Sequence, residues 1–183
     1  MKILNVAVWG LGPHAISRII PALKKIDKIS VYGVCSRSQK SVDMISGELN
    51  CQGWTNPLEM LKSKLVDIVY IATPIGLHAI QVKQALNAGK HVWCEKPLTC
   101  SLKETKTLIS LASERNKMLT EGFMYLYHPQ FEKVKSFVNE NESNGIYSIT
   151  ARFGLPLLEK PGFRNDLSLC GGAFWDVASY TVS

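Results

Sequence analysis

Residues 3–15 read ILNVAVWGLGPHA, an apolar run that is followed by two glycines and then by a helical pattern. Residues 3–9 predict a strand, and residues 14–26 place their apolar side chains on one helical stripe, with a kink expected at Pro21. The glycine turn between them matches G-x-G-x-x-[G/A]. A strand, a glycine turn and a helix in this order are typical of a dinucleotide-binding unit, although a turn with two glycines can also be purely structural.

The glycines and the alanine of this loop are each suited to their position for a physical reason. The first glycine permits the tight turn, the second lets a pyrophosphate approach the backbone, and Ala15 is small enough for close packing of the helix on the strand. The helix then supplies free amide hydrogens and positive potential. His14 either binds a phosphate or is simply exposed. The predicted phosphate-binding residues are Gly10, Leu11, Gly12, Pro13, His14 and Ala15.

Strand and helix patterns alternate along the chain up to residue 121. Strands are predicted at residues 3–9, 29–35, 66–72, 91–95 and 117–121, and helices at 14–26, 39–49, from 57 onward, 77–88 and 102–116. This alternation predicts an α/β fold with a Rossmann-type, doubly wound parallel sheet. The carboxyl ends of parallel strands meet at one edge of such a sheet, where ligands bind.

The pattern changes after residue 122. Residues 123–140 predict a helix once Pro129 has passed, and residues 146–155 alternate like a strand with one exposed face. We therefore expect a dinucleotide-binding domain at 1–122. The remaining residues, 123–183, are expected to begin an α+β domain for substrate binding and oligomerisation that is incomplete here.

Composition argues against several other classes of protein. The chain has 183 residues and a net charge of +6, but its lysines are scattered, so no nucleic-acid site is expected. No apolar run is long enough for a membrane span or a signal peptide, and we expect a cytoplasmic protein. The five cysteines lack CxxC spacing and predict reduced, mostly buried thiols, with neither a disulfide frame nor a zinc site. The four histidines show no metal-ligand spacing, so no metal is expected.

The turn after residues 29–35 bears on the choice of cofactor. NAD-binding chains usually carry an acid near the end of this strand, but there is none between Lys28 and Val42. Instead Ser36, Arg37 and Ser38 offer hydroxyls and a guanidinium that suit a 2′-phosphate. This pattern favours NADP, with NAD as the alternative. A solvated turn with a helix cap at one of the serines would explain the same residues.

Five motifs resemble those of a known family: the glucose–fructose oxidoreductase, inositol dehydrogenase and MocA-like NAD(P)-dependent oxidoreductases. They are GLGPHA (10–15), ATPIGLH (72–78), AGKHVWCEKPL (88–98), EGFMYLYHPQ (121–130) and GGAFWDVASY (171–180). The most specific element is Glu-Lys-Pro at 95–97. The resemblance implies hydride transfer between NADP(H) and a secondary alcohol or ketone of a small polyol, sugar, cyclitol or dihydrodiol. It also implies a homo-oligomer for full-length relatives, which are nearly twice as long.

The resemblance also implies roles for particular residues. Lys96 would contact the nicotinamide ribose and the substrate, in a turn shaped by Glu95 and Pro97. Asp176 matches the family's motif aspartate, and Tyr180 lies four residues later, on the same helical face. The predicted catalytic residues are therefore Lys96, Asp176 and Tyr180. In this hypothesis Tyr180 accepts the hydroxyl proton, and the Lys96 ammonium favours its phenolate.

Further residues are carried over from the resemblance alone. The predicted cofactor contacts are completed by Thr73, Pro74, His78, Glu95 and Lys96, and the predicted substrate contacts are His128 and Arg164. Simpler roles stay open, because Lys96 could bind only the cofactor, while His78 and Tyr180 could be structural. Ile75 and Leu126 replace a polar and a charged residue of the family pattern. A nucleotide-binding module without catalysis, or an inactive truncated fragment of such an enzyme, therefore remains an alternative.

Overall fold

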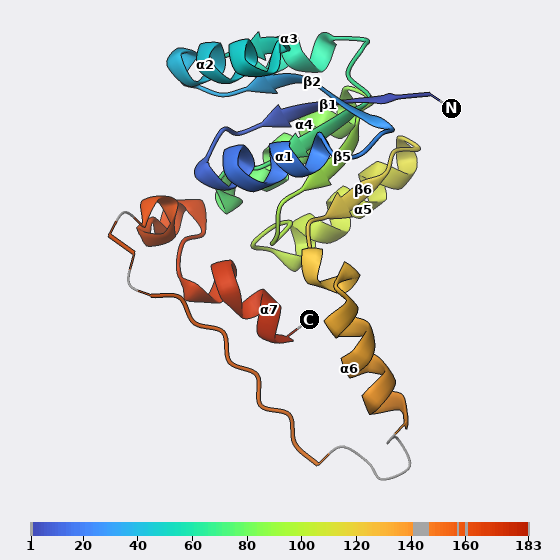
Figure 1. The fold of residues 1–183 in the computed structure, drawn as a ribbon, viewed down its shortest axis with the longest axis vertical. Helices are drawn as coiled ribbons and strands as arrows, with labels where there is room; N and C mark the ends of the chain where they lie inside the picture. Colours follow the sequence, from blue (N-terminus) through green and yellow to red (C-terminus); the bar gives the residue numbers. More distant parts are fainter. Residues whose placement is uncertain (1, 141–146, 157, 160, 183) are drawn as a thin grey trace.

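The fold is built on a six-stranded sheet whose strands are all parallel, in the order β3-β2-β1-β4-β5-β6 (Figure 1). The computed structural model describes residues 2–140, 147–156, 158–159 and 161–182. The strands are β1 (Leu4–Trp9), β2 (Ile29–Cys35), β3 (Gln52–Trp54), β4 (Ile68–Ile71), β5 (His91–Cys94) and β6 (Leu119–Glu121). The order reverses between β1 and β4, as in a Rossmann sheet. The predicted fold class is confirmed.

Helices connect the strands and begin where capping residues satisfy their first amides. They are η1 (Ala15–Ile19), α1 (Ile20–Leu23), α2 (Gln39–Leu49), α3 (Pro57–Lys62), η2 (Ile75–Leu77), α4 (His78–Asn87) and α5 (Leu102–Glu114). The side chains of Ser38, Asn56 and Ser101 accept hydrogen bonds from amides in the first turns of α2, α3 and α5. At the predicted kink, the π-helical turn η1 passes into α1, and Pro21 lies at its start.

The core lies on both faces of the sheet because alternate residues of each strand point to opposite sides. On β1, Ala7 and Trp9 join an apolar cluster with buried residues of α3, α4 and α5. Val6 and Val8 face the other way and pack with buried residues of η1, α1 and α2. The strands are therefore buried between two helical layers, which is why they read as continuous apolar runs.

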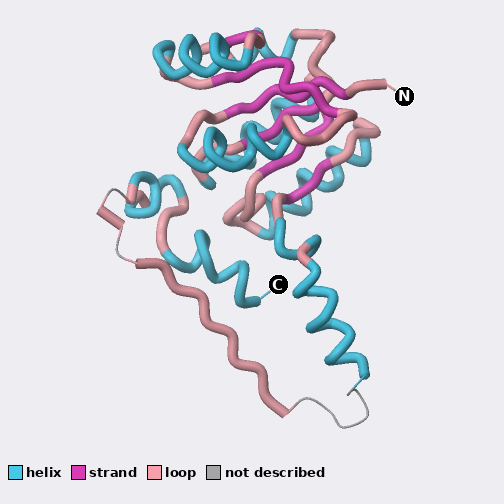
Figure 2. The backbone as a smooth tube through the Cα atoms, in the orientation of Figure 1, coloured by secondary structure: helices cyan, strands magenta, loops and turns pink. Residues whose placement is uncertain are grey.

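After β6, the chain runs away from the sheet and then returns toward it. After η3 (Met124–Tyr127), helix α6 (Pro129–Glu140) is directed away from the sheet, and residues 147–156 run as a long loop (Figure 2). The chain then returns through η5 (Gly162–Asn165), η6 (Leu167–Leu169), η7 (Phe174–Ala178) and α7 (Ser179–Val182). The returning segment 161–182 brings the predicted residues Arg164, Asp176 and Tyr180 back toward the sheet.

The strand predicted at 146–155 is wrong for the residues that the structure describes. Residue 146 lies outside the described residues, and residues 147–155 form a loop. Their apolar side chains are largely exposed, with Tyr147 at 98% and Ile149 at 77% of full exposure. A strand needs a neighbour to bond its amides and carbonyls, and this segment pairs with no strand in the described part of the chain.

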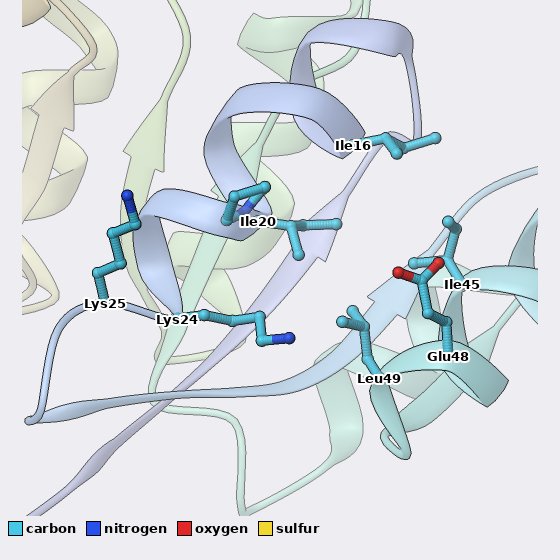
Figure 3. A pocket seen from close by; sticks show the side chains of 8 residues that line it. Ile16, Ile20, Lys24, Lys25, Ile45, Glu48 and Leu49 are labelled. Carbon is cyan, nitrogen blue, oxygen red and sulfur yellow. The ribbon is translucent and has the colours of Figure 1, made fainter.

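Two of the hollows among the described residues border helix α1. A shallow one of about 330 Å³ lies between α1 and α2, with Ile16, Ile20, Ile45 and Leu49 at its apolar floor and Lys24 and Glu48 on its rim (Figure 3). A larger one of about 580 Å³ lies over β4, β5 and β6 on the face that α1 covers only in part. Within the described residues, no helix has the length and apolarity needed to cross a membrane.

Candidate active site at the carboxyl edge of the sheet

Four loops meet at the carboxyl edge because the strands that precede them are parallel neighbours. Gly10 follows β1, Ser36 follows β2, Thr73 lies two residues after β4, and Glu95 follows β5. The Gly10 amide donates to the Cys35 carbonyl at the end of β2, and the Glu95 amide donates to the carbonyl that ends β4. The sheet thus gathers the predicted cofactor residues from loops that are far apart in sequence.

The two glycines of the first loop have different surroundings. Gly10 has φ +109°, and a Cβ added there would lie 2.7 Å from the backbone of Ala72, so only glycine fits. A Cβ at Gly12 would meet no atom within 4 Å. The open side of Gly12 leaves room for a group that contacts the backbone closely, and Ala15 is buried against the sheet as expected. This cradle fits the pyrophosphate of a dinucleotide.

The loop after β2 combines a helix cap with an exposed cation. Ser38 caps α2 by accepting a hydrogen bond from the Ser41 amide, so the capping alternative holds for this serine. The Ser36 hydroxyl accepts from the Ser38 amide at 3.4 Å. Arg37 is exposed between them, and its guanidinium is available for a phosphate at this edge. A role of Ser36, Arg37 and Ser38 in cofactor choice stays a prediction.

Glu95 is a junction between three elements. Its Oε1 accepts a hydrogen bond of 2.5 Å from the Tyr70 hydroxyl on β4, and the same oxygen lies 3.1 Å from His14 Nε2 in the phosphate loop. Tyr70 was not among the predicted site residues. A tyrosine inside the apolar run 66–72 needs a partner for its hydroxyl, and this need could have pointed to it. The pair of bonds ties the phosphate loop to the loop that carries Lys96.

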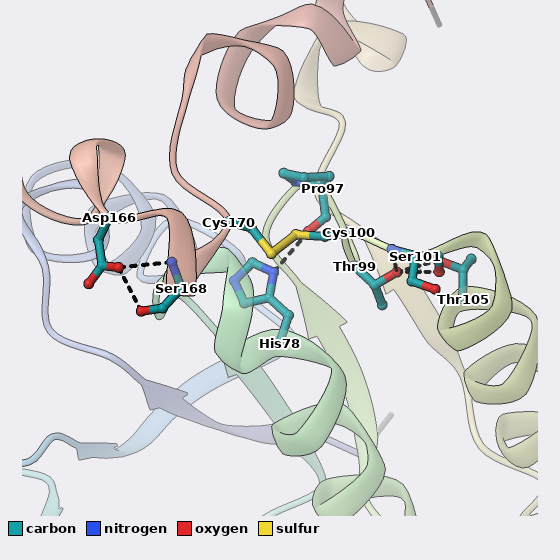
Figure 4. Close-up of a disulfide and its surroundings, with 9 residues drawn as sticks. All are labelled: His78, Pro97, Thr99, Cys100, Ser101, Thr105, Asp166, Ser168 and Cys170. Atoms are coloured by element: carbon teal, nitrogen blue, oxygen red, sulfur yellow. Dashed lines mark hydrogen bonds between the residues drawn. A yellow bond between two sulfur atoms is a disulfide. The ribbon is translucent and has the colours of Figure 1, made fainter.

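His78 lies under the same loops, not in the open crevice. Its Nδ1 lies 2.9 Å from the Pro97 carbonyl and its Nε2 lies 2.8 Å from the Thr73 carbonyl, and the residue is 1% exposed (Figure 4). Burial lowers the pKa of His78, against the opposing effect of those two carbonyl oxygens. The two ring nitrogens therefore lie against carbonyls of the loops after β4 and β5, and a neutral imidazole donates a hydrogen bond to one of them. Thr73 also donates to Gln81 Oε1 at 2.5 Å, and Pro74 directly precedes η2.

The three residues that were predicted to carry the chemistry meet here. The Lys96 ammonium donates to the backbone carbonyl of Asp176 and lies 3.4 Å from its carboxylate. It also lies 4.6 Å from the centroid of the Tyr180 ring. The other carboxylate oxygen of Asp176 accepts a hydrogen bond of 2.6 Å from Arg164 Nε. The side chains of Lys96 and Asp176 are each 11% exposed, so this charged group is well shielded from water.

Tyr180 has a different electrostatic environment from the one that we expected. Its ring stacks on Phe153 at 4.9 Å, and its hydroxyl lies 4.0 Å from the sulfur of Met124. Burial raises the pKa of Tyr180, and the charges of Glu95 and Asp176 raise it further. The expectation that Lys96 favours the phenolate is therefore wrong for this structure, in which the ammonium faces the ring and Tyr180 stays a neutral phenol near pH 7.

The cysteine prediction needs a correction. Cys100 and Cys170, which lie 70 residues apart, form a disulfide, whereas Cys35, Cys51 and Cys94 are free (Figure 4). The pairing depends on tertiary packing, because η6 lies directly on η2: a Cβ at Gly76 would be 2.7 Å from Leu169 Cα. No local spacing in the sequence reports such a contact. The disulfide joins the loop of Lys96 to the segment that carries Arg164 and Asp176.

The structure does not bring every predicted residue into this cluster. His128 lies at the start of α6, where its Nδ1 accepts a hydrogen bond from the Gln130 amide. It borders a separate shallow hollow together with Met124 and Phe131. Its predicted contact with a substrate stays a prediction. Across the described residues, no group of three or more His, Cys, Asp or Glu side chains is arranged to hold a metal ion.

Comparison with known proteins identifies one family. Residues 4–123 match the model of the oxidoreductase family with an NAD-binding Rossmann fold, the Gfo/Idh/MocA group. The match ends just after β6 and covers the whole sheet, including the phosphate loop and the Glu-Lys-Pro turn.

Individual relatives extend the similarity through the returning segment. The chain is 31% identical over 98% of its length to a dTDP-3,4-didehydro-2,6-dideoxy-alpha-D-glucose 3-reductase from Saccharopolyspora spinosa, of which it covers 54%. It is 32% identical over 96% of its length to D-xylose 1-dehydrogenase (NADP(+)) 2 from Haloferax volcanii, and again covers 54%. The chain therefore spans about half the length of these relatives.

A solved structure gives the same picture in three dimensions. A 3-ketoreductase from Actinomadura kijaniata, in complex with NADP and TDP-benzene, superposes with a TM-score of 0.89 and 32% identity. The match covers 98% of this chain and 55% of the ketoreductase. The similarity therefore includes the segment after residue 123, beyond the family model.

Proposed function

Because the chain belongs to the oxidoreductase family with an NAD-binding Rossmann fold, we propose that it binds NADP(H) and interconverts a ketone and a secondary alcohol on a sugar-like substrate. The observation that carries the proposal is the meeting of Lys96, Asp176 and Tyr180 at the carboxyl edge of the sheet. Lys96 lies on the loop that Glu95 ties to the phosphate loop, whereas Asp176 and Tyr180 lie on the returning segment.

The residues at the edge suit a dinucleotide with a 2′-phosphate. The open side of Gly12 would receive the pyrophosphate, and the Arg37 guanidinium would pair with the 2′-phosphate. The lack of an acid between Lys28 and Val42 supports NADP over NAD. Relatives that carry NADP in their names support the same choice.

Side chains of this chain would bind and polarise the carbonyl oxygen of the substrate. NADPH, when bound, supplies the hydride that reduces a carbonyl carbon. The Lys96 ammonium would donate a hydrogen bond to the carbonyl oxygen and stabilise the negative charge that develops there. Asp176 holds that ammonium in place and is itself held by Arg164. Lys96 thus acts as a positioned cation, fixed by a shielded carboxylate.

Tyr180 is suited to donate a proton. Burial raises its pKa, so the phenol is protonated near neutral pH and carries a proton that it could donate. Proton donation to a developing alkoxide is the step that ketone reduction requires. In the direction of ketone reduction, Tyr180 or Lys96 would be the proton donor.

The substrate class follows from the relatives and remains part of the proposal. They are named as enzymes of a deoxy sugar nucleotide and of D-xylose, so a sugar or sugar nucleotide is proposed here. Homo-oligomer formation and a cytoplasmic location stay predictions.

A second function is favoured by specific residues. Ile75 is buried where the family usually carries asparagine, and Leu126 replaces the arginine of a close match. A chain that covers about half of its relatives could bind the cofactor without turning over a substrate. Binding of the cofactor without turnover of any substrate would support this second function, a nucleotide-binding module without catalysis.

A turnover assay separates the two functions. The chain is incubated with NADPH and a panel of keto sugars, including a 3-keto sugar nucleotide, and the loss of reduced cofactor is followed. Turnover that disappears in Lys96→Met supports the enzyme. Saturable NADPH binding with no turnover on any ketone supports the module, and the absence of both contradicts the proposal.

A further inference from the structure

Tyr70 is a buried polar residue that the proposed mechanism does not use. It lies on β4 and is only 2% exposed, with its ring 5.2 Å from the ring of Trp93 on β5. Its hydroxyl donates to Glu95 Oε1 at 2.5 Å. A tyrosine in the middle of a buried strand needs such a partner, because an unpaired buried hydroxyl is unfavourable.

Glu95, the partner of Tyr70, connects this tyrosine to the phosphate loop and to the Lys96 loop. The oxygen that accepts from Tyr70 also lies 3.1 Å from His14 Nε2 in the phosphate loop. Glu95 is the residue directly before Lys96, so its placement affects the start of the catalytic turn. One carboxylate oxygen thus joins β4, the phosphate loop and the Lys96 loop.

The hydroxyl of Tyr70 limits where the Glu95 carboxylate can point. His14 is on the rim, with its side chain 48% exposed, whereas the Glu95 side chain is 12% exposed. A bond from an exposed histidine alone would hold the carboxylate weakly, since water competes for it. The bond from the buried tyrosine does not face that competition and is the stronger restraint.

We propose that Tyr70 is a positioning residue, which fixes Glu95 so that the carboxylate binds His14 and holds the phosphate loop against the Lys96 loop. Removal of the hydroxyl frees Glu95 to turn toward water, and the two loops then move independently. The effect on cofactor binding rests on the proposed function. The link between Tyr70, Glu95 and His14 does not, because it is present in the chain without a cofactor.

The first test measures the link without any cofactor. The coupling between His14→Ala and Glu95→Gln is obtained from urea unfolding, once with tyrosine and once with phenylalanine at position 70. Tyr70→Phe keeps the ring that packs on Trp93. We expect a several-fold coupling in the unfolding constant that falls to within twofold in the phenylalanine background. An equal coupling in both backgrounds would overturn the inference.

The second test measures the consequence for the cofactor. Tyr70→Phe is expected to raise the Kd for NADPH by about five- to tenfold, somewhat less than the loss of a direct hydrogen bond to a charged group. In a Glu95→Gln background the same change should add less than twofold. Equal increments in both backgrounds would mean that the Tyr70 hydroxyl does not act through Glu95, and would contradict the positioning role.

A matched control is available on the opposite face of the sheet. Tyr32 lies on β2 and packs its ring on Trp54 at 6.1 Å, much as Tyr70 packs on Trp93. Tyr32→Phe should leave the Kd for NADPH within twofold of the wild type. A folded wild-type chain that fails to bind NADPH would contradict the proposed function, and the unfolding cycle alone would then decide the inference about Tyr70.

Discussion

Lys96 and Asp176 lie 80 residues apart in the chain, yet the Lys96 ammonium donates to the Asp176 backbone carbonyl and lies 3.4 Å from its carboxylate. The lysine lies on the loop after β5 and the aspartate on the returning segment. Their pairing, with both side chains shielded, forms the candidate site where the two parts of the chain meet. Removal of one partner from a buried ion pair strongly destabilises the folded protein, because the other charge is left unpaired.

Replacement of Lys96 tests its chemical role. Lys96→Met should lower turnover by about 10²–10⁴-fold, the range expected when a positioned proton donor is lost. NADPH binding should fall much less, which a fluorescence titration would verify. Lys106→Met on the exposed side of α5 is the matched control. Turnover by Lys96→Met within tenfold of the wild type would rule out the assigned role.

The glycines of the phosphate loop should respond differently to alanine. Gly10→Ala should destabilise the fold by at least about 1–3 kcal/mol, because its backbone conformation is strained for any other residue and its Cβ would strike Ala72. Gly12→Ala should fold normally, since the space is open, but should bind NADPH about tenfold or more weakly. Urea unfolding and titration check the pair. Normal NADPH affinity in Gly12→Ala would exclude this loop as the pyrophosphate site.

Arg37 should control the choice between the two nicotinamide dinucleotides. Arg37→Ala should weaken NADPH binding by about tenfold or more, the effect expected when a charge-assisted hydrogen bond is lost. NADH binding should stay within about twofold because NADH has no 2′-phosphate. Lys40→Ala, one residue into α2, controls for the loss of general positive charge. An equal loss for both cofactors would contradict a specific contact.

The disulfide should stabilise the attachment of the returning segment. Reduction by a dithiol, or Cys170→Ser, should lower the free energy of unfolding by up to about 4 kcal/mol, given the 70-residue separation of the two cysteines. Cys51→Ser, which removes a free and partly exposed thiol, should have little effect. Alkylation followed by mass spectrometry of the unreduced chain would show the pairing directly. Two free thiols at positions 100 and 170 in an air-oxidised sample would contradict it.

Glu121 should make stability depend on pH. Its Oε1 accepts a hydrogen bond from the Leu98 amide, yet burial raises the pKa of this carboxyl above its ordinary value of 4.5. Because the pKa of Glu121 is raised in the folded state, its carboxyl contributes to the free energy of unfolding at low pH. That contribution is lost as the pH rises through the raised pKa. Glu121→Gln should therefore match the wild type in Tm near pH 4 and exceed it near pH 8. A constant difference in Tm across this range would contradict the shift.

Much of the fold could be predicted from the sequence, because local signals agree with the final packing. The strand at 29–35 and the helix at 39–49 match the structure residue for residue, since a buried apolar run and the Ser38 cap mark their bounds. The strand β3 was missed because three residues are too few for a pattern. The pattern at 146–155 resembles a strand, but a strand depends on a partner that no local pattern supplies.

The candidate site was only partly accessible from the sequence. The phosphate loop has a local motif, whereas the meeting of Lys96 with Asp176 depends on the path of the chain and was expected only from resemblance. The bond from Tyr70 to Glu95 and the Cys100–Cys170 disulfide depend on tertiary packing across 25 and 70 residues. The raised pKa of Tyr180 depends on burial and on the nearby charges of Glu95 and Asp176, which only the tertiary structure brings together.

The most direct test of the central claim is a parallel titration of the 183-residue chain with NADPH and NADH, followed by nicotinamide fluorescence. We expect saturable binding of both forms, with NADPH bound about tenfold or more tightly, because of a charge-assisted contact with the 2′-phosphate. A folded chain that binds neither form would contradict the assignment of the carboxyl edge as a dinucleotide site, and tighter binding of NADH would contradict the role given to Arg37.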